Sequence, residues 1–323
     1  MFPLIRLFPS NSNINLLGFR RITLALSLLL VVTSIALFFT RQLNLGIDFK
    51  GGVLFDLRFS EAVSIEAVKT DLTELGYGTP EVQAFGSEQD VNVVFAVPAA
   101  ATEEGEIALV GEMKNAVRKL YPPLLEGEDL TLAKDTAAEG NLVFENGTVE
   151  YRRVENVGSK ISGELAQKGA LATALALLAI AAYIWFRFEW QFAIAALLAL
   201  THDVVTTIGL FALFQFTFDL PTVAAILTIA GYSINDTVVV FDRAREEMRR
   251  YNERPVTEVL NLALNRTLSR TLMTSLTTML ALLALFAFGP LVIRDFTIAL
   301  MWGVLIGTYS SLFFATPLLV VMG

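Results

Sequence analysis

The stretch Ala225–Arg245 constrains what this chain can fold into more than any other part of the sequence. Its first part, Ala225–Val240, is apolar enough to form the inner part of a transmembrane helix, yet it contains Asn235 and Asp236. An ionisable group inside a membrane span costs at least ~3 kcal/mol on insertion scales, and it normally needs a partner, a water-filled cavity or a proton. The sequence therefore predicts that Asp236 has a function that outweighs this cost.

Composition places the chain among membrane proteins. Of its 323 residues, 54% are hydrophobic, and the mean hydropathy is +0.58, which is high for a soluble domain. The absence of cysteine excludes disulfides and thiolate chemistry, and the single histidine, His202, excludes any site that needs several histidines. We expect no metal site, no cofactor and no enzymatic activity.

The charges are unevenly distributed. Of the 32 acidic and 24 basic residues, 21 and 10 lie between residues 44 and 160, which gives this region a net charge of −11. The other 11 acidic and 14 basic residues give the remainder a net charge of +3. An acidic soluble part and a slightly basic membrane part argue against nucleic acid as the main partner.

Six apolar runs are long enough to cross a membrane. They are residues 22–39, 167–186, 190–214, 220–241, 270–288 and 295–320. The first could be a signal peptide, but no A-x-A cleavage site follows it, so we interpret it as an uncleaved anchor. Segments 1–21 and 242–266 are predicted to be cytoplasmic.

The arginines predict the orientation. Those assigned to the inner side are Arg6, Arg20, Arg21, Arg187, Arg243, Arg245, Arg249, Arg250 and Arg254. The short outer turns contain essentially Arg294 alone. By the positive-inside rule, the N-terminus is cytoplasmic and the large domain at 44–160 lies on the other side of the membrane.

The region 44–160 is predicted to be an α+β domain. Alternating apolar residues at 53–59, together with the runs 81–85, 91–97 and 149–157, indicate strands, and 65–75 and 102–120 have helical spacing. The order β-α-β-β-α-β is typical of the ferredoxin-like pattern. A polar insertion, Leu124–Gly147, precedes the last strand, and Asn146-Gly147 within it is a hairpin turn signal.

Polar side chains gather in three of the predicted spans. The fourth span contains Asn235 and Asp236; the fifth contains Arg270, Thr274, Thr277 and Thr278 on one face; and the third contains His202 and Asp203, with Thr206 and Thr207 one turn later.

We interpret Asp236 as a proton-carrying residue. Antiparallel packing of the fourth and fifth spans would bring Asp236 and Arg270 to similar depth. A cation favours the ionised carboxylate and burial favours the neutral acid, and their opposition makes a switchable site. The alternatives are a static ion pair or an Arg270 that reaches the membrane interface. His202-Asp203 is either a relay element or a packing pair.

Glycines mark two further places. In the sixth span, Gly303 and Gly307 precede Ser310 and Ser311, and this small-residue pattern favours close helix packing. After the first span comes LGIDFKGG, with Gly46, Asp48, Gly51 and Gly52, whose glycines allow a tight backbone path into the first strand.

These motifs, in this order, resemble the SecF subunits of the SecD/SecF family of protein-export membrane proteins. The resemblance covers nearly the whole chain, through LGIDFKGG, FRFEW, ALTHD, GYSINDTVVVFDRARE and RTLMTSLTT. It implies a half-unit of the resistance-nodulation-division type, with six spans and an outer domain after the first. The long insertion and the near absence of a cytoplasmic tail depart from the family pattern.

The resemblance also implies a function. SecD is expected to supply the other half, and the pair to use the proton gradient to assist late steps of export through SecYEG in the bacterial inner membrane. The translocating preprotein, YajC and YidC are further expected partners. Asp236 and Arg270 match family residues of the proton pathway, and Asn235 and Thr274 beside them are expected to belong to it.

Three other functions remain open from the residues alone. A half-unit of a proton-coupled transporter for small molecules or lipids would share the buried charges, but it usually needs a larger outer domain with an apolar pocket. An intramembrane aspartyl protease would use Asp203 and Asp236, but the GxGD context is missing. A membrane scaffold leaves Asp236 unexplained.

Overall fold

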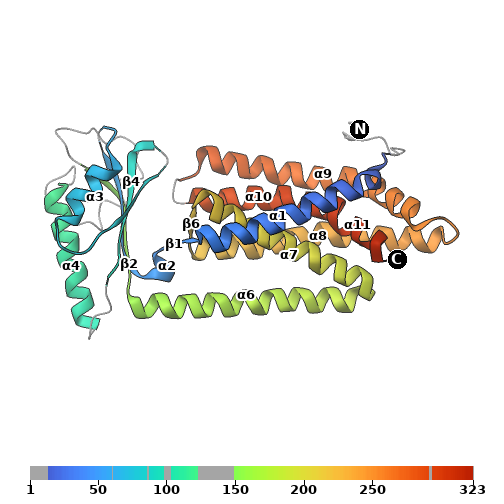
Figure 1. Ribbon diagram of the computed structural model, residues 1–323, viewed down its shortest axis with the longest axis horizontal. Coiled ribbons are helices and arrows are strands. Elements are labelled where there is room, and N and C mark those ends of the chain that lie inside the picture. Colours follow the sequence, from blue (N-terminus) through green and yellow to red (C-terminus); the bar gives the residue numbers. More distant parts are fainter. Residues whose placement is uncertain are drawn as a thin grey trace, which may run out of the picture. The chain divides into compact units, whose positions relative to one another are not determined.

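The computed structural model describes residues 14–59, 61–85, 87–97, 103–122, 149–290 and 293–322. The chain divides into two compact units, labelled by their helices and strands in Figure 1. One unit, Leu45–Lys168, is called the α+β domain below. The other combines Met1–Asn44 with Gly169–Gly323 and is called the helical unit.

Within the described ranges, six helices are long and apolar enough to cross a membrane, as the sequence predicts. They are α1 (Arg20–Arg41), α6 (Ser159–Arg187), α7 (Trp190–Phe214), α8 (Leu220–Arg250), α9 (Val256–Phe288) and α10 (Arg294–Ser310), which continues through a π-helical turn (Ser311–Ala315) into α11 (Thr316–Met322). A 3-10 helix, η1 (Leu16–Phe19), precedes α1, and the short strands β1 (Asn44–Leu45) and β6 (Thr217–Phe218) follow α1 and α7.

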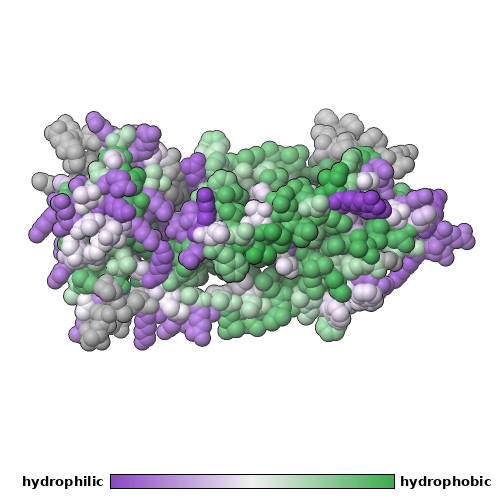
Figure 2. Space-filling view, viewed as in Figure 1, coloured by the Kyte–Doolittle hydropathy of each residue, from purple (hydrophilic) through white to green (hydrophobic). Residues whose placement is uncertain are grey.

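The helical unit has three inner and three outer helices. In the apolar segments of α7, α8 and the α10–α11 helix, at least half of the residues are buried. In those of α1, α6 and α9, about one tenth of the residues or fewer are buried. Large apolar side chains such as Leu29, Leu178 and Phe288 point outward, and Figure 2 shows an apolar surface over the visible helices. This surface is suited to contact with lipid.

The helices α8 and α9 extend beyond the predicted span ends. The segment 242–266 is predicted to be charged, with an amphipathic helix from Pro255. In the structure α8 continues to Arg250, and the helix from Val256 is present but runs without a break into the fifth span as α9. The charges are accommodated because Glu247, buried on α8, pairs with Arg243 at 2.8 Å and with Arg266 of α9. Helices can therefore continue through a polar sequence whose charges pair between neighbouring turns and helices.

The α+β domain consists of one sheet and the helices that cover it. Its elements are β2 (Gly52–Phe59), α3 (Ile65–Thr73), β3 (Glu81–Phe85), β4 (Ser87–Phe95), α4 (Glu103–Leu120) and β5 (Val149–Val157), preceded by the short helix α2 (Ile47–Lys50). The strand order is β3-β4-β2-β5, and the neighbouring strands are antiparallel. The insertion Leu124–Gly147, with its predicted turn at Asn146-Gly147, lies outside the described residues.

Alternation along β2 builds the core of the α+β domain. Val53, Phe55 and Leu57 are buried together with Leu72 of α3 and Met113 of α4. In Figure 1, α3 and α4 lie on the same side of the sheet. The intervening β2 residues occupy the opposite face, as expected from the period of two along a strand.

The sequence pattern predicts a tight backbone path at the LGIDFKGG motif, but it does not predict the short helix α2. Gly51 ends α2 with φ 71°, and Gly52 opens β2 with φ 136°. A Cβ atom at Gly52 would lie 2.2 Å from the carbonyl oxygen of Phe95 on β4. Position 52 therefore requires glycine both for its backbone angle and for the close approach of β4.

Candidate functional site

Asp236 lies on α8 among the inner helices, and its residue is only 4% exposed. Its Oδ2 atom is buried and has no hydrogen-bond partner in the described part of the chain. A buried polar atom without a partner costs free energy and calls for an explanation, such as a proton, a water molecule or a partner subunit. Oδ2 of Asp236 is therefore available to a proton, a water molecule or a group of a partner subunit.

Arg270 lies on α9, next to α8, and is exposed. It is the charged residue whose electrostatic field acts on Asp236. Among the described residues, however, no hydrogen bond and no ion pair within 4.0 Å joins the two side chains. Asp236 is thus an unpaired carboxyl group with a cation nearby. That the two residues lie at similar depth in the membrane stays a prediction.

The hydroxyls of the fifth span bond within their own helix. Thr274 donates to the carbonyls of Thr271 (2.8 Å) and Arg270 (3.2 Å), and Thr277 and Thr278 likewise donate one turn back. These bonds satisfy the hydroxyl protons, so Thr274 does not donate to Asp236 in this arrangement.

The packed helices α8 and α9 each expose polar side chains on one face. We call these side chains together the polar strip, and its residues are Thr228 and Asn235 of α8 and Arg270, Thr274 and Thr277 of α9. Asn235 thus points away from the inner helices, whereas its neighbour Asp236 is buried. Polar side chains within a span rarely face lipid, so this strip is suited to contact with another membrane protein.

The second polar centre is built around Asp203 of α7, which is 0% exposed. Its Oδ1 atom is 2.8 Å from Nδ1 of His202, and its Oδ2 atom accepts from the hydroxyls of Ser233 (2.5 Å) and Ser310 (2.7 Å). The His202 ring stacks on Phe314, with centroids 4.9 Å apart, and its Nε2 atom is buried without a hydrogen-bond partner in the described residues. The structure thus adds two serines to the sequence neighbours His202 and Asp203, and whether this pair is a relay element or a packing pair stays open.

Ser310 and Ser311 are the residues whose role the sequence pattern did not indicate. The pattern predicts them as small residues for helix packing, and the packing is present: a Cβ at Gly303 would lie 2.1 Å from Cγ1 of Ile229, and a Cβ at Gly307 would lie 3.1 Å from Cβ of Ser233. In addition, both serines make hydrogen bonds to other helices. The signal available in the sequence was a pair of consecutive hydroxyls on the small-residue face.

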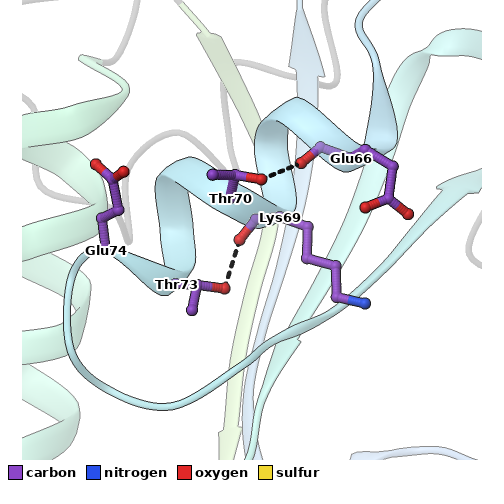
Figure 3. A pocket seen from close by; sticks show the side chains of 5 residues that line it. All are labelled: Glu66, Lys69, Thr70, Thr73 and Glu74. Carbon is purple, nitrogen blue, oxygen red and sulfur yellow. Dashed lines mark hydrogen bonds between the residues drawn. The ribbon is translucent and has the colours of Figure 1, made fainter.

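The α+β domain contains a shallow depression along α3, shown in Figure 3. Its lining residues are Glu66, Lys69, Thr70, Thr73 and Glu74. The hydroxyls of Thr70 and Thr73 donate to carbonyls of their own helix, at 2.8 and 2.6 Å. Because the lining comes from one exposed helix and its hydroxyl protons are already used, the depression offers little to a ligand.

Comparison with known proteins gives the family. The model of the family "Protein export membrane protein SecD/SecF, C-terminal" matches residues 139–323, and that of the "SecD/SecF GG Motif" matches residues 36–63. A protein translocase subunit SecF from Magnetococcus marinus is 42% identical over 318 residues, covering 98% of this chain and 94% of that protein.

The chain belongs to the SecD/SecF family. Further SecF subunits agree: the one from Cereibacter sphaeroides is 40% identical, covering 99% of this chain and 92% of that protein, and the one from Rickettsia felis is 36% identical, covering 99% and 94%. The GG-motif match includes Gly46, Asp48, Gly51 and Gly52, the motif around α2.

Two solved SecDF structures have the same fold over this chain. SecDF from Thermus thermophilus, described as a translocon-associated membrane protein, has a TM-score of 0.78 at 32% identity, and SecDF in a super-membrane-facing form has a TM-score of 0.64 at 31% identity. This chain is covered to 98% and 99%, but it spans only 39% and 40% of those longer chains. As a SecD/SecF family member, the present chain thus corresponds to one part of SecDF.

Proposed function

We propose that this chain is an auxiliary subunit of the Sec protein-export machinery of the bacterial inner membrane. Together with a SecD partner, it uses the proton gradient to promote late steps of preprotein translocation through SecYEG, with YajC and YidC as further neighbours. The names of the relatives, protein translocase subunit SecF, support the export role.

The observation on which the proton part rests is the environment of Asp236. The carboxyl group is buried in a membrane helix, has one oxygen without a hydrogen-bond partner among the described residues, and is near Arg270 without being paired to it. A carboxyl group in this setting can exist with or without a proton, and a change between the two states alters the charge between α8 and α9. Such a change can be transmitted to helix packing.

The polar strip supports a membrane partner. Its residues are exposed in the lone chain, although α8 and α9 are membrane spans. In a complex, membrane helices of SecD would cover Asn235, Arg270 and Thr274 and place them in a protein interior, where a proton pathway can be lined by polar groups.

The α+β domain is proposed to lie in the periplasm, with the N-terminus in the cytoplasm. The arginines at the α8 end, Arg249 and Arg250, support this orientation through the positive-inside rule. We also propose a ferredoxin-like fold for the domain. Its order β2-α3-β3-β4-α4-β5 and the antiparallel pairing of β2 with both β4 and β5 support this assignment.

The Asp236→Asn variant tests the proposal. Asparagine has nearly the same volume and resembles the protonated acid, but it cannot release a proton. We expect the variant to insert, to assemble with SecD and to lose export stimulated by an imposed proton gradient, measured in vesicles with matched amounts of complex. Arg270→Ala should cause a similar loss, because it removes the charge that acts on Asp236.

The matched control is Asp242→Asn on the same helix. Asp242 forms an exposed ion pair with Arg187 at 2.6 Å, and exposed pairs contribute little to stability. Its replacement should leave gradient-stimulated export near the wild-type level. Wild-type stimulation by Asp236→Asn at equal abundance would exclude Asp236 from the mechanism.

A further inference from the structure

Four consecutive residues near the end of α10 make side-chain hydrogen bonds to four different helices. We call Thr308–Ser311 the hydroxyl run, because each of its residues has a hydroxyl group. Thr308 bonds to Ser275 of α9, and Tyr309 bonds to Ser27 of α1. Ser310 bonds to Asp203 of α7, and Ser311 bonds to Thr237 of α8. One turn of helix thereby contacts every long helix of the helical unit except α6.

Two of these contacts hold the helices that contain Asp236 and Arg270. Ser311 shares a hydrogen bond of 2.8 Å with Thr237, the residue after Asp236. Thr308 shares one of 2.6 Å with Ser275, which lies close to Arg270 on α9. Each of these two hydroxyls is also within hydrogen-bond distance of a carbonyl of its own helix, that of Val304 for Thr308 and that of Thr271 for Ser275, so one of them gives its proton to the other hydroxyl and not to its carbonyl. The hydroxyl run therefore fixes both α8 and α9 close to the two charged residues.

The anchor of the run is the carboxylate of Asp203. Its Oδ2 atom accepts from the hydroxyls of Ser233 and Ser310, and its Oδ1 atom lies 2.8 Å from Nδ1 of His202, which donates in the tautomer that has the ring proton on Nδ1. Hydrogen bonds from hydroxyls to a carboxylate are stronger than those to a neutral acceptor. The same carboxylate thus joins α7 to α8 and to α10.

Ser233 completes the connection to Asp236. Ser233 lies three residues before Asp236 and four before Thr237, so its side chain shares a face of α8 with each of them, whereas Asp236 and Thr237 themselves point in different directions. Ser233 is bound to Asp203, and Thr237 is bound to Ser311 in the π-helical turn. The segment of α8 around Asp236 is therefore held at two points one helical turn apart. π-Helical turns often occur at functional sites.

We propose that Asp203 and the hydroxyl run are positioning residues for Asp236. By fixing α8 and α9 against α7 and α10, they set the place of the Asp236 carboxyl group relative to Arg270. His202 orients the Asp203 carboxylate through Nδ1 and does not pass a proton onward. This inference rests on the proposed role of Asp236 in proton-driven export.

The test uses the complex of this chain with SecD in vesicles. Thr308→Val removes one hydroxyl while nearly keeping the shape of the side chain, Thr308→Ser keeps the hydroxyl, and Ser310→Ala removes a donor to Asp203. The matched control is Thr297→Val, since Thr297 is buried on the same helix and donates only to the carbonyl of Ile293, within its own helix turn. The readouts are gradient-driven export and the infrared band of the Asp236 carboxyl group, identified as the band that Asp236→Asn removes.

We expect Thr308→Val and Ser310→Ala to lower gradient-driven export roughly five- to tenfold, the loss that one missing hydrogen bond would cause. Both should also change the frequency of the Asp236 band, since the group then has a different environment. Thr308→Ser and Thr297→Val should leave export and the band unchanged. If Ser310→Ala does not assemble, the comparison of Thr308→Val with Thr308→Ser decides the question.

The possible failures are distinguishable. Suppose that the wild type has the Asp236 band and that Thr308→Val and Ser310→Ala leave its frequency unchanged. This result would overturn the positioning role and leave the proposed function standing. Equal changes in Thr297→Val would overturn it as well, because any buried substitution would then have the same effect. If Asp236→Asn removes no band and keeps gradient-driven export, both the proposed function and this inference are wrong.

Discussion

At the scale of single residues, Asp56 is an acidic group of the α+β domain whose environment makes stability depend on pH. It lies on β2 with 8% exposure, and its Oδ1 atom has no hydrogen-bond partner in the described part of the chain. Burial raises the pKa of the Asp56 carboxyl group from 3.8 to about 6. Arg153 opposes the increase in pKa, whereas Glu155 and Asp90 add to it.

The raised pKa of Asp56 makes the domain less stable at higher pH. Because the folded domain binds the Asp56 proton more tightly than the unfolded chain does, the free energy of unfolding falls as pH rises from about 4 to 6. A difference of about two pKa units corresponds to roughly 3 kcal/mol, which we take as an upper value. The ionised carboxylate of Asp56 therefore destabilises the domain at neutral pH.

We predict that Asp56→Asn slows proteolysis of the α+β domain at pH 8 and has a smaller effect at pH 4.5. Asparagine cannot ionise, so it removes the cost of burying a negative charge. The rate of trypsin cleavage in the detergent-solubilised complex measures the opening of the domain. Glu88→Gln, at an exposed position, is the control. Equal effects of Asp56→Asn at the two pH values would contradict the prediction.

At the scale of elements, the packing of α10 on α8 depends on Gly303. A Cβ atom there would lie 2.1 Å from Cγ1, 2.6 Å from Cδ1 and 2.7 Å from Cγ2 of Ile229. Since most of the Ile229 side chain is in the way, a change of its rotamer alone would not make room. We predict that Gly303→Ala lowers the free energy of unfolding by about 1–3 kcal/mol, as overpacked cores do.

The measurement for Gly303→Ala is thermal unfolding of the complex in mild detergent. Gly163→Ala is the matched control, because Gly163 is also helical and a Cβ there meets no atom within 4 Å. The control should leave the unfolding temperature unchanged or raise it slightly, since alanine favours helix more than glycine does. An unchanged unfolding temperature in Gly303→Ala would show that the α8–α10 contact adapts to the larger residue.

Much of the element pattern could be predicted from the sequence, because spans and strands follow the spacing of apolar residues. The third span, 190–214, coincides with α7, and the predicted strands 81–85 and 149–157 coincide with β3 and β5. The helix start near Pro255 was also predicted, but the continuation of α8 to Arg250 and the unbroken course of α9 could not be predicted in this way. They depend on the buried Glu247 and its pairing with Arg266, a residue nineteen positions away on another helix.

The candidate site was predictable only in part. Asp236 and the pair His202-Asp203 are conspicuous in apolar surroundings, so the sequence predicts them as functional candidates. Serine and threonine give no such signal, because in membrane helices they usually bond to their own backbone, as Thr274 does. Which hydroxyls instead cross to another helix, as Ser310 does, depends on helix packing.

At the scale of the whole molecule, the helical unit has two kinds of surface. The face over the helices that is visible in Figure 2 is largely apolar and suited to lipid, whereas the polar strip on α8 and α9 is not. A polar group in lipid is costly, so the lone chain is expected to be less stable than a complex in which SecD covers the strip. The stability of this subunit therefore depends on the concentration of its partner.

We predict that the chain purified alone in mild detergent unfolds or aggregates sooner than the chain co-purified with SecD. Substitutions within the polar strip distinguish this explanation from a general effect of detergent. Thr228→Leu and Thr277→Leu should stabilise the lone chain, because they replace exposed hydroxyls by apolar groups. They should also weaken association with SecD, by about tenfold if about 1.4 kcal/mol of binding is lost.

The control for these substitutions is Leu178→Ile on the exposed face of α6, which should change neither property. Thermal stability of the lone chain and co-purification with SecD are measured for each variant at matched expression. A stable and fully active lone chain would remove the argument for a partner at this surface. Wild-type association of Thr228→Leu and Thr277→Leu would place the SecD contact elsewhere on the helical unit, and Asn235 and Arg270 would then need another explanation for their exposure.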